Sequence, residues 1–166
     1  MSTTLVCAFA FGQPSSTRVN LYLASVAEKV AHDKTAPVYT QADIAIPPNG
    51  DCSFEVFYFL EEEGNPPPTL RLARWVAAQA QERGVERIIV IAAAPHLFRA
   101  WRDVYRACKE RRLAIFIEVP AELEDNPRDW FSPESSQERV HSWWKWWRRE
   151  ILLRMMPFWL YSRVAS

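Results

Sequence analysis

Residues 87–99 indicate the fold most clearly, and they read Arg87-Ile88-Ile89-Val90-Ile91-Ala92-Ala93-Ala94-Pro95-His96-Leu97-Phe98-Arg99. The first half of this stretch is an apolar run without polar alternation, which is typical of a parallel strand buried on both faces. Pro95 suits the first turn of a helix, because a helix start leaves its first N–H groups without partners in any case. The stretch therefore predicts a central strand that leads directly into a helix.

The same alternation of strand and helix extends in both directions along the chain. A second apolar run, residues 5–11, ends at Gly12 and predicts another central strand. Further patterns predict helices that start after Ser15 or Ser16, over 69–83 and over 95–112, and strands over 36–41, 54–60 and 113–119. This order indicates an α/β protein, and we expect a Rossmann-like three-layer sandwich with a mostly parallel sheet.

Two of these helices carry recognisable end signals. Ser15 or Ser16 can cap the first helix, which ends near Lys34, and Thr69 can cap the second. Gly84 stands where a helix C-terminal cap prefers glycine, because that position often requires a positive φ. The segment between the second and third strands looks too short for a helix.

Composition limits the classes of protein to which the chain can belong. The chain has 166 residues, of which 49 % are hydrophobic and 24 % are charged. We therefore expect residues 1–166 to form one α/β domain with a Trp-rich basic helical segment from about residue 132. The 20 Lys and Arg balance the 20 Asp and Glu, so no net field favours nucleic acid as a partner. Dinucleotide, P-loop, zincin and esterase motifs are absent from the sequence, and we expect no metal site.

Cysteine usage and the N-terminal residues predict a cytoplasmic protein. Cys7, Cys52 and Cys108 lack the spacing of a zinc site or a disulfide framework, so we expect small buried side chains in a reduced compartment. The N-terminal residues show no basic leader and no cleavage site of a signal peptide. No apolar run reaches the length of about 18 residues that a transmembrane helix needs.

Candidate ligand-binding residues follow from the fold, because ligands bind parallel sheets outside the carboxyl ends of the strands. The residues that come just after the predicted strands are Gly12, Gln13, Ser15, Gln41, Asp43, Glu61, Thr69, His96 and Arg99. We expect Gly12, Gln13, Ser15, Gln41, Thr69, His96 and Arg99 to form the ligand-binding site. No catalytic residue is assigned, and whether the protein is an enzyme stays open.

The turn before His96 carries the most chemical information. Neither Ala93 nor Ala94 has a side chain that can cap the following helix, which leaves its N-terminus open to water or an anion. His96 and Arg99 are three residues apart, so they can point together toward the sheet edge. Together they would bind a phosphate or carboxylate, or the histidine would act as acid or base. The alternative is a helix-start histidine beside a solvated arginine.

Three segments carry a resemblance to a known family. They are Thr69-Leu70-Arg71-Leu72-Ala73-Arg74-Trp75-Val76, Gly84-Val85-Glu86-Arg87-Ile88-Ile89-Val90-Ile91 and Pro95-His96-Leu97-Phe98-Arg99-Ala100. The series resembles the bacterial family of unknown function that includes YdcF, SanA and ElyC, in which a helix opened by Thr and a hydrophobic strand precede a His-x-x-Arg-Ala motif. The resemblance implies a Rossmann-like fold and a pocket for a nucleotide-like ligand such as S-adenosylmethionine. For some members it implies roles in envelope or peptidoglycan biology.

This chain departs from the family pattern at three places, one of which is the segment Asp43 to Ser53, which is too short for the helix that the family places after its second strand. Only Gly12 stands at the end of the first strand, where the family has several glycines. The polar positions of the Thr-x-Glu-Asn pattern are lost in Thr69-Leu70-Arg71-Leu72. The resemblance therefore implies the fold more strongly than it implies the family's ligand.

The C-terminal segment is unusual in charge and in tryptophan content. Residues 139–166 contain five Arg and one Lys against one Glu, a net charge of +5, and five of the eight Trp. Trp and Arg on one helix can lie in a lipid headgroup layer, which predicts a peripheral membrane contact. The alternative is a helix that packs onto the sheet or onto a second copy, with inward residues Trp143, Trp147, Ile151 and Met155.

Adjacent indoles cannot all face one side of a helix, so some of them must meet a partner, a membrane or a ligand. The residues in question are Trp143, Trp144, Trp146 and Trp147.

Two functions follow from the sequence. The first is the binding of a small anionic or nucleotide-like ligand at the carboxyl edge of the sheet. In the second, the protein is a non-enzymatic, envelope-associated scaffold or interaction protein that binds through its Trp-rich basic C-terminus.

Overall fold

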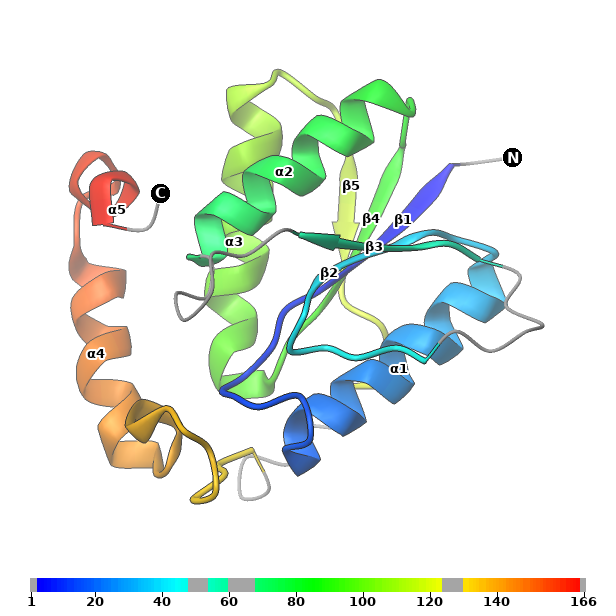
Figure 1. Ribbon diagram of the computed structural model, residues 1–166. Helices are drawn as coiled ribbons and strands as arrows, with labels where there is room; N and C mark the ends of the chain where they lie inside the picture. The colour runs from blue at the N-terminus through cyan, green and yellow to red at the C-terminus, as the bar shows by residue number, and fades with distance from the viewer. Residues whose placement is uncertain (1–2, 48–53, 60–67, 124–129, 165–166) are drawn as a thin grey trace.

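A computed structural model of the chain describes residues 3–47, 54–59, 68–123 and 130–164. Five strands form one sheet in the order β3-β2-β1-β4-β5, and every neighbouring pair in it is parallel. Helices cover both faces of the sheet, so the protein has the predicted Rossmann-like three-layer α/β fold (Figure 1).

The elements follow the predicted alternation, and several are shorter than the sequence pattern suggested. Their bounds are β1 Thr4–Ala8, α1 Arg18–Lys34, β2 Val38–Gln41, β3 Val56–Phe59, α2 Thr69–Glu82, β4 Arg87–Ile91, α3 Ala94–Glu110, β5 Phe116–Glu118, a 3₁₀ turn Glu138–Val140, α4 Trp143–Met155 and α5 Phe158–Val164. The first strand ends at Ala8 rather than at Phe11, because the chain turns away from its neighbours before the apolar run is complete. Residues 42–47, between β2 and β3, contain no helix.

Burial on both faces explains why β1 and β4 read as continuous apolar runs. Val6 and Ala8 pack on the side covered by α1, while Leu5 and Cys7 pack on the side covered by α2 and α3. Figure 1 shows α1 on one side of the sheet and α2 and α3 on the other. Because residues 5–8 of β1 and 88–91 of β4 have no solvent face, each of these positions selects an apolar side chain.

The ends of the helices show that two predicted N-caps are wrong and that a third predicted signal, a C-terminal glycine, is right. Thr17, not Ser15 or Ser16, is the N-cap of α1, and its side chain accepts the Asn20 N–H. Pro68 occupies the N-cap position of α2, so Thr69 is the first helical residue and its hydroxyl is free to serve another partner. Gly84 follows α2 with φ +60°, which confirms the glycine signal.

A C-terminal arm, residues 130–164, folds back over the carboxyl edge of the sheet and contains α4 and α5. The prediction that Trp143, Ile151 and Met155 face inward is wrong, whereas Trp147, predicted with them, is partly buried against the core. Trp146, Glu150 and Leu153 face inward instead. The face was misjudged because its centre carries a charge, Glu150, which two arginines of the fold neutralise.

Cys7 and Cys108 are buried free thiols, as predicted, whereas Cys52 lies outside the described residues. Burial raises the pKa of both thiols, that of Cys108 to about 11, so neither is ionised near neutral pH. Within the described ranges, no helix is both long and apolar enough to cross a bilayer.

Candidate functional site

A cavity of about 470 Å³ lies at the carboxyl edge of the sheet, between the C-terminal arm and the loops that follow the strands. The strand order reverses between β1 and β4, which is where parallel sheets of this type open a crevice for ligands. The cavity is lined by Ala10, Phe11, Gly12, Gln13, Gln41, Pro68, Thr69, His96, Arg99, Gln137, Arg139, Val140, Trp146, Arg149, Glu150, Leu153, Tyr161 and Val164.

Six of the seven expected site residues line this one cavity, namely Gly12, Gln13, Gln41, Thr69, His96 and Arg99. The seventh, Ser15, does not line it, because it lies in the turn that leads away to the N-cap of α1 at Thr17. Asp43 accepts a hydrogen bond from Gln13 Nε2 (3.2 Å) and so holds the side chain of this cavity-lining residue. Glu61 lies outside the described residues.

Asn20 fixes the loop after β1. Its side chain is fully buried, accepts the Phe11 N–H at 2.9 Å, and donates to the carbonyl oxygens of Gly12 and Pro14 at 3.0 and 3.1 Å. Three backbone groups of one turn are thus held by a single amide. This arrangement makes the first wall of the cavity rigid before any ligand binds.

Gly12 allows the C-terminal arm to approach that loop closely. Its φ is +90°, and a Cβ at this position would meet Val140 Cγ2 at 2.7 Å and Ser135 Oγ at 2.8 Å. Ser135 Oγ donates to the Gln13 carbonyl oxygen (2.7 Å) and accepts the Gln13 N–H (3.1 Å). Glycine is required here by the conformation and by this contact with the arm.

His96 is a buried, neutral side chain at the start of α3. Its ring packs near Phe9, Phe11 and Trp146, with centroid distances of 6.1, 6.5 and 5.6 Å. Burial, reinforced by the charge of Arg99, lowers the pKa of its imidazole well below the usual value. Its Nδ1 is buried and has no hydrogen-bond partner among the described residues.

The N-terminus of α3 carries no side-chain cap, as its sequence predicted, and neither does that of α2. Both helices begin at the edge of the sheet where the cavity lies, and Pro68 and Thr69 of α2 contribute to its lining. Their positive dipole ends therefore add to the charge of nearby arginines.

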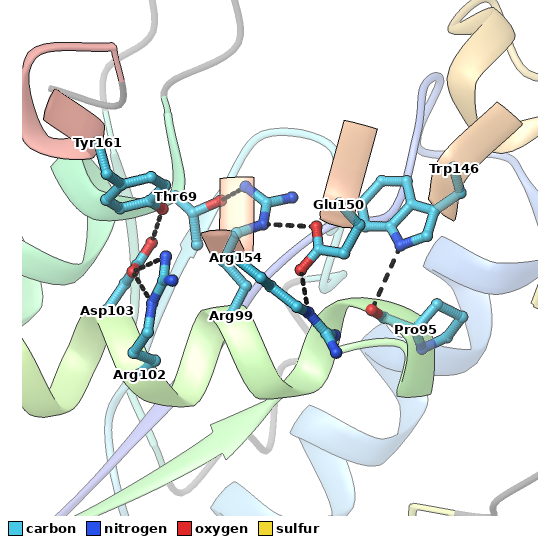
Figure 2. A network of polar contacts seen from close by, with 9 residues as sticks. All are labelled: Thr69, Pro95, Arg99, Arg102, Asp103, Trp146, Glu150, Arg154 and Tyr161. Atoms are coloured by element: carbon cyan, nitrogen blue, oxygen red, sulfur yellow. Dashed lines mark hydrogen bonds and ion pairs between the residues drawn. The ribbon is translucent and has the colours of Figure 1, made fainter. Parts of the chain in front are cut away.

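Arg99 joins the two halves of the cavity. Its Nη1 donates to Thr69 Oγ1 (3.0 Å) and its Nε to Glu150 Oε2 (3.0 Å), while Arg154 Nε donates to Glu150 Oε1 (3.1 Å) (Figure 2). The Glu150 side chain is 1 % exposed, so α4 brings a buried carboxylate between two guanidinium groups. Trp146 completes the contact, because its Nε1 donates to the Pro95 carbonyl oxygen at 3.3 Å.

A second polar cluster holds α5 in place. The Tyr161 hydroxyl donates to Asp103 on α3, and Arg102 contacts the same carboxylate at 3.2 Å (Figure 2). Burial raises the pKa of the Asp103 carboxyl, while the hydrogen bond from Tyr161 and the charge of Arg102 oppose that shift. Asp103 is completely buried and therefore depends on these two partners.

Two further arginines face the cavity without a counter-charge. Among the described residues, Arg139 and Arg149 have no hydrogen-bond or ion-pair partner, and both line the cavity. Burial, together with Arg149 and Arg99, lowers the pKa of the Arg139 guanidinium to about 10. It is still protonated at neutral pH, so three arginines and one glutamate give the lining a net positive charge.

Sequence reasoning missed Gln137, Arg139, Arg149 and Glu150 of the C-terminal arm, and it named Trp146 only among the indoles that must meet a partner, a membrane or a ligand. Gln137 Oε1 is a second buried atom without a partner among the described residues. The positive charge of residues 139–166 was the available signal, but nothing in their spacing told which of them would face the sheet. Across the residues that are described, no group of His, Cys, Asp or Glu is arranged to hold a metal ion.

Comparisons with known proteins leave the family open. No family model matches the chain, and no curated protein matches it. Among solved structures, a glycosyltransferase from Rickettsia africae ESF-5 superposes with a TM-score of 0.40 and 15 % identity, covering 78 % of this chain and 32 % of that one. This chain thus spans about a third of the length of that structure. A likeness at this level says nothing about the ligand, and the resemblance to the YdcF family stays a prediction.

Proposed function

We propose that this protein binds a small anionic or nucleotide-like ligand in the cavity at the carboxyl edge of its sheet. The observation that carries the proposal is the pair of cavity-lining arginines, Arg139 and Arg149, which have no counter-charge among the described residues. The Arg139 guanidinium is partly buried, so leaving it without an anion is costly, whereas Arg149 is exposed and adds positive charge to the lining.

The rest of the lining supports the same kind of ligand. Guanidinium groups bind phosphate and carboxylate oxygens in pairs, and the uncapped starts of α2 and α3 favour negative charge at the same place. The unpartnered His96 Nδ1 and Gln137 Oε1 belong to residues that line the cavity, but both atoms are buried, so a ligand would reach them only after a change of side-chain conformation.

Size and charge rank the ligands. A cavity of about 470 Å³ is within the range typical of small-molecule sites, which is roughly 300–1,000 Å³. A phosphate-bearing nucleotide matches the positive lining better than S-adenosylmethionine, whose sulfonium is itself cationic. S-adenosylmethionine would have to bind through its carboxylate, and it is kept as the nucleotide-like ligand that the family resemblance suggests.

The test is a thermal-shift panel on the wild type, Arg139→Gln and Arg111→Gln. The probes are inorganic phosphate, pyrophosphate, adenosine mono- and diphosphate, a uridine diphosphate sugar, S-adenosylmethionine and S-adenosylhomocysteine. Arg111 is the matched control, because it is an exposed arginine at the opposite end of α3 that donates to Gln81 (2.9 Å). A ligand at about 100 times its Kd stabilises by about 2.7 kcal/mol, which raises the Tm by roughly 5–10 °C.

We expect at least one phosphate-bearing probe to stabilise the wild type and Arg111→Gln, and to lose most of its effect in Arg139→Gln. If no probe shifts the Tm, or if the shift is the same in Arg139→Gln, the cavity is not the binding site. A shift confined to S-adenosylmethionine and S-adenosylhomocysteine would keep the site but reverse the ranking of ligands.

A further inference from the structure

The side of the C-terminal helices that faces away from the cavity is apolar and exposed. We define the outer face by eight exposed residues of α4 and α5, none of which lines the cavity: Trp144, Arg148, Ile151, Leu152, Met155, Trp159, Leu160 and Arg163. Met155 is 79 % exposed, Trp144 65 % and Trp159 63 %. Exposed apolar side chains are ordinary when they are scattered, but a contiguous group of this kind marks an interaction surface.

Helix geometry shows that four of the α4 residues form one stripe. Trp144, Arg148, Ile151 and Met155 are spaced i, i+4, i+7 and i+11, which places them on one side of α4. The inward residues of the same helix, centred on Trp146, lie on the opposite side. Helix α4 is therefore apolar on two opposite faces, and the protein's own core covers only one of them. Figure 1 shows α4 at the edge of the molecule with no described element outside it.

Indoles and cations alternate on this surface. Trp144 stacks on Trp143, with ring centroids 5.5 Å apart, and the Arg163 guanidinium lies 5.8 Å from the Trp159 ring centroid. Arg148 is exposed in the middle of the stripe and has no carboxylate partner among the described residues. Amphipathic side chains of these two kinds prefer the boundary between hydrocarbon and lipid headgroups.

We propose that the outer face docks on the surface of an anionic lipid membrane, with α4 and α5 lying in the plane of the headgroups. In this arrangement the indoles reach the headgroup boundary, while Arg148 and Arg163 contact lipid phosphates. Arg148 and Arg163 supply the attraction to anionic lipid, because the other basic residues of the segment line the cavity or pair with Glu138 and Glu150.

Charge also argues against a second copy of the chain as the occupant. A symmetric dimer through this face would bring each Arg148 and Arg163 close to the same residues of its partner, and the outer face contains no carboxylate to separate them. Membrane docking involves no such repulsion. Because the outer face lies on the other side of α4 from the cavity, this proposal stands independently of the proposed ligand.

The experiment is co-sedimentation with vesicles of phosphatidylcholine alone and of equal parts phosphatidylcholine and phosphatidylglycerol, at low and high salt. Tryptophan emission reports insertion of the indoles. We expect binding to the mixed vesicles, weak binding to phosphatidylcholine alone, and release as salt rises.

Two sets of substitutions separate the apolar and electrostatic contributions. The triple variant Trp144→Gln, Ile151→Gln, Met155→Gln should lower the partition coefficient by on the order of tenfold or more, because it removes the inserting side chains. The pair Arg148→Gln, Arg163→Gln should lower it about fivefold for each arginine and remove the preference for phosphatidylglycerol. Leu21→Gln is the control, because Leu21 is an exposed apolar residue of α1 (55 %) far along the chain from the basic segment.

All of these side chains are exposed, so circular dichroism should show the same unfolding midpoint in every variant. If the triple variant does not fold, the arginine pair still tests the proposal. Protein that stays in the supernatant at low salt would overturn it. So would equal binding by the wild type and the arginine pair, or a lipid-free dimer that the triple variant dissociates, which would identify a second copy as the occupant.

Discussion

Substitution of Gly12 by alanine tests the contact that builds the cavity from two distant parts of the chain. The new Cβ would lie 2.7 Å from Val140 Cγ2 and 2.8 Å from Ser135 Oγ, at a φ of +90°. The conformation costs about 1–2 kcal/mol for a residue with a Cβ, and overpacking adds about 1–3 kcal/mol. We therefore expect Gly12→Ala to lower the free energy of unfolding by roughly 2–5 kcal/mol.

Gly84→Ala is the matched control. Its φ is +60°, but no atom lies within 4 Å of the position that a Cβ would occupy, so only the conformational cost of about 1–2 kcal/mol applies. Urea unfolding followed by tryptophan fluorescence measures both variants. With an m-value of about 2 kcal/mol/M, the midpoint of Gly12→Ala should lie about 0.5–1.5 M below that of Gly84→Ala.

A double variant locates the clash. Val140→Ala removes the nearest atom, so adding it to Gly12→Ala should cost less than the sum of the two single substitutions. Equal midpoints for Gly12→Ala and Gly84→Ala, or strict additivity with Val140→Ala, would refute the close approach of the C-terminal arm to the loop after β1.

Two further predictions concern the buried charges of the site. Glu150→Gln leaves Arg99 and Arg154 without their shared carboxylate, and we expect the free energy of unfolding to fall by about 3–5 kcal/mol in urea titrations; a loss below about 1 kcal/mol would show that the carboxylate is not needed. The lowered pKa of His96 means that below about pH 6.5 the unfolded chain binds a proton that the folded protein does not, so stability should fall as pH drops below that value. His96→Leu should flatten this part of the profile and His32→Leu, at an exposed histidine, should not; identical profiles for wild type and His96→Leu would contradict the burial of a neutral imidazole.

The amino-acid sequence was sufficient to predict the layered fold and the edge of the sheet at which the candidate site lies. Strands buried on both faces leave continuous apolar runs, and helix starts and stops depend on residues within one turn, so both are visible in short windows. The parallel sheet then brings the residues that follow its strands to one edge, and this is why Gly12, Gln41, Thr69, His96 and Arg99 line one cavity.

The way in which the C-terminal arm closes that cavity could be seen only in the tertiary structure. Arg99 and Glu150 are 51 residues apart, and Gln13 and Ser135 are 122 apart, so no local pattern connects them. Periodicity placed apolar residues of α4 inward, but the ion pairs of Glu150 favour a different face of the same helix. A buried charge is stable only where its partners converge, and that convergence depends on the packing of the whole chain.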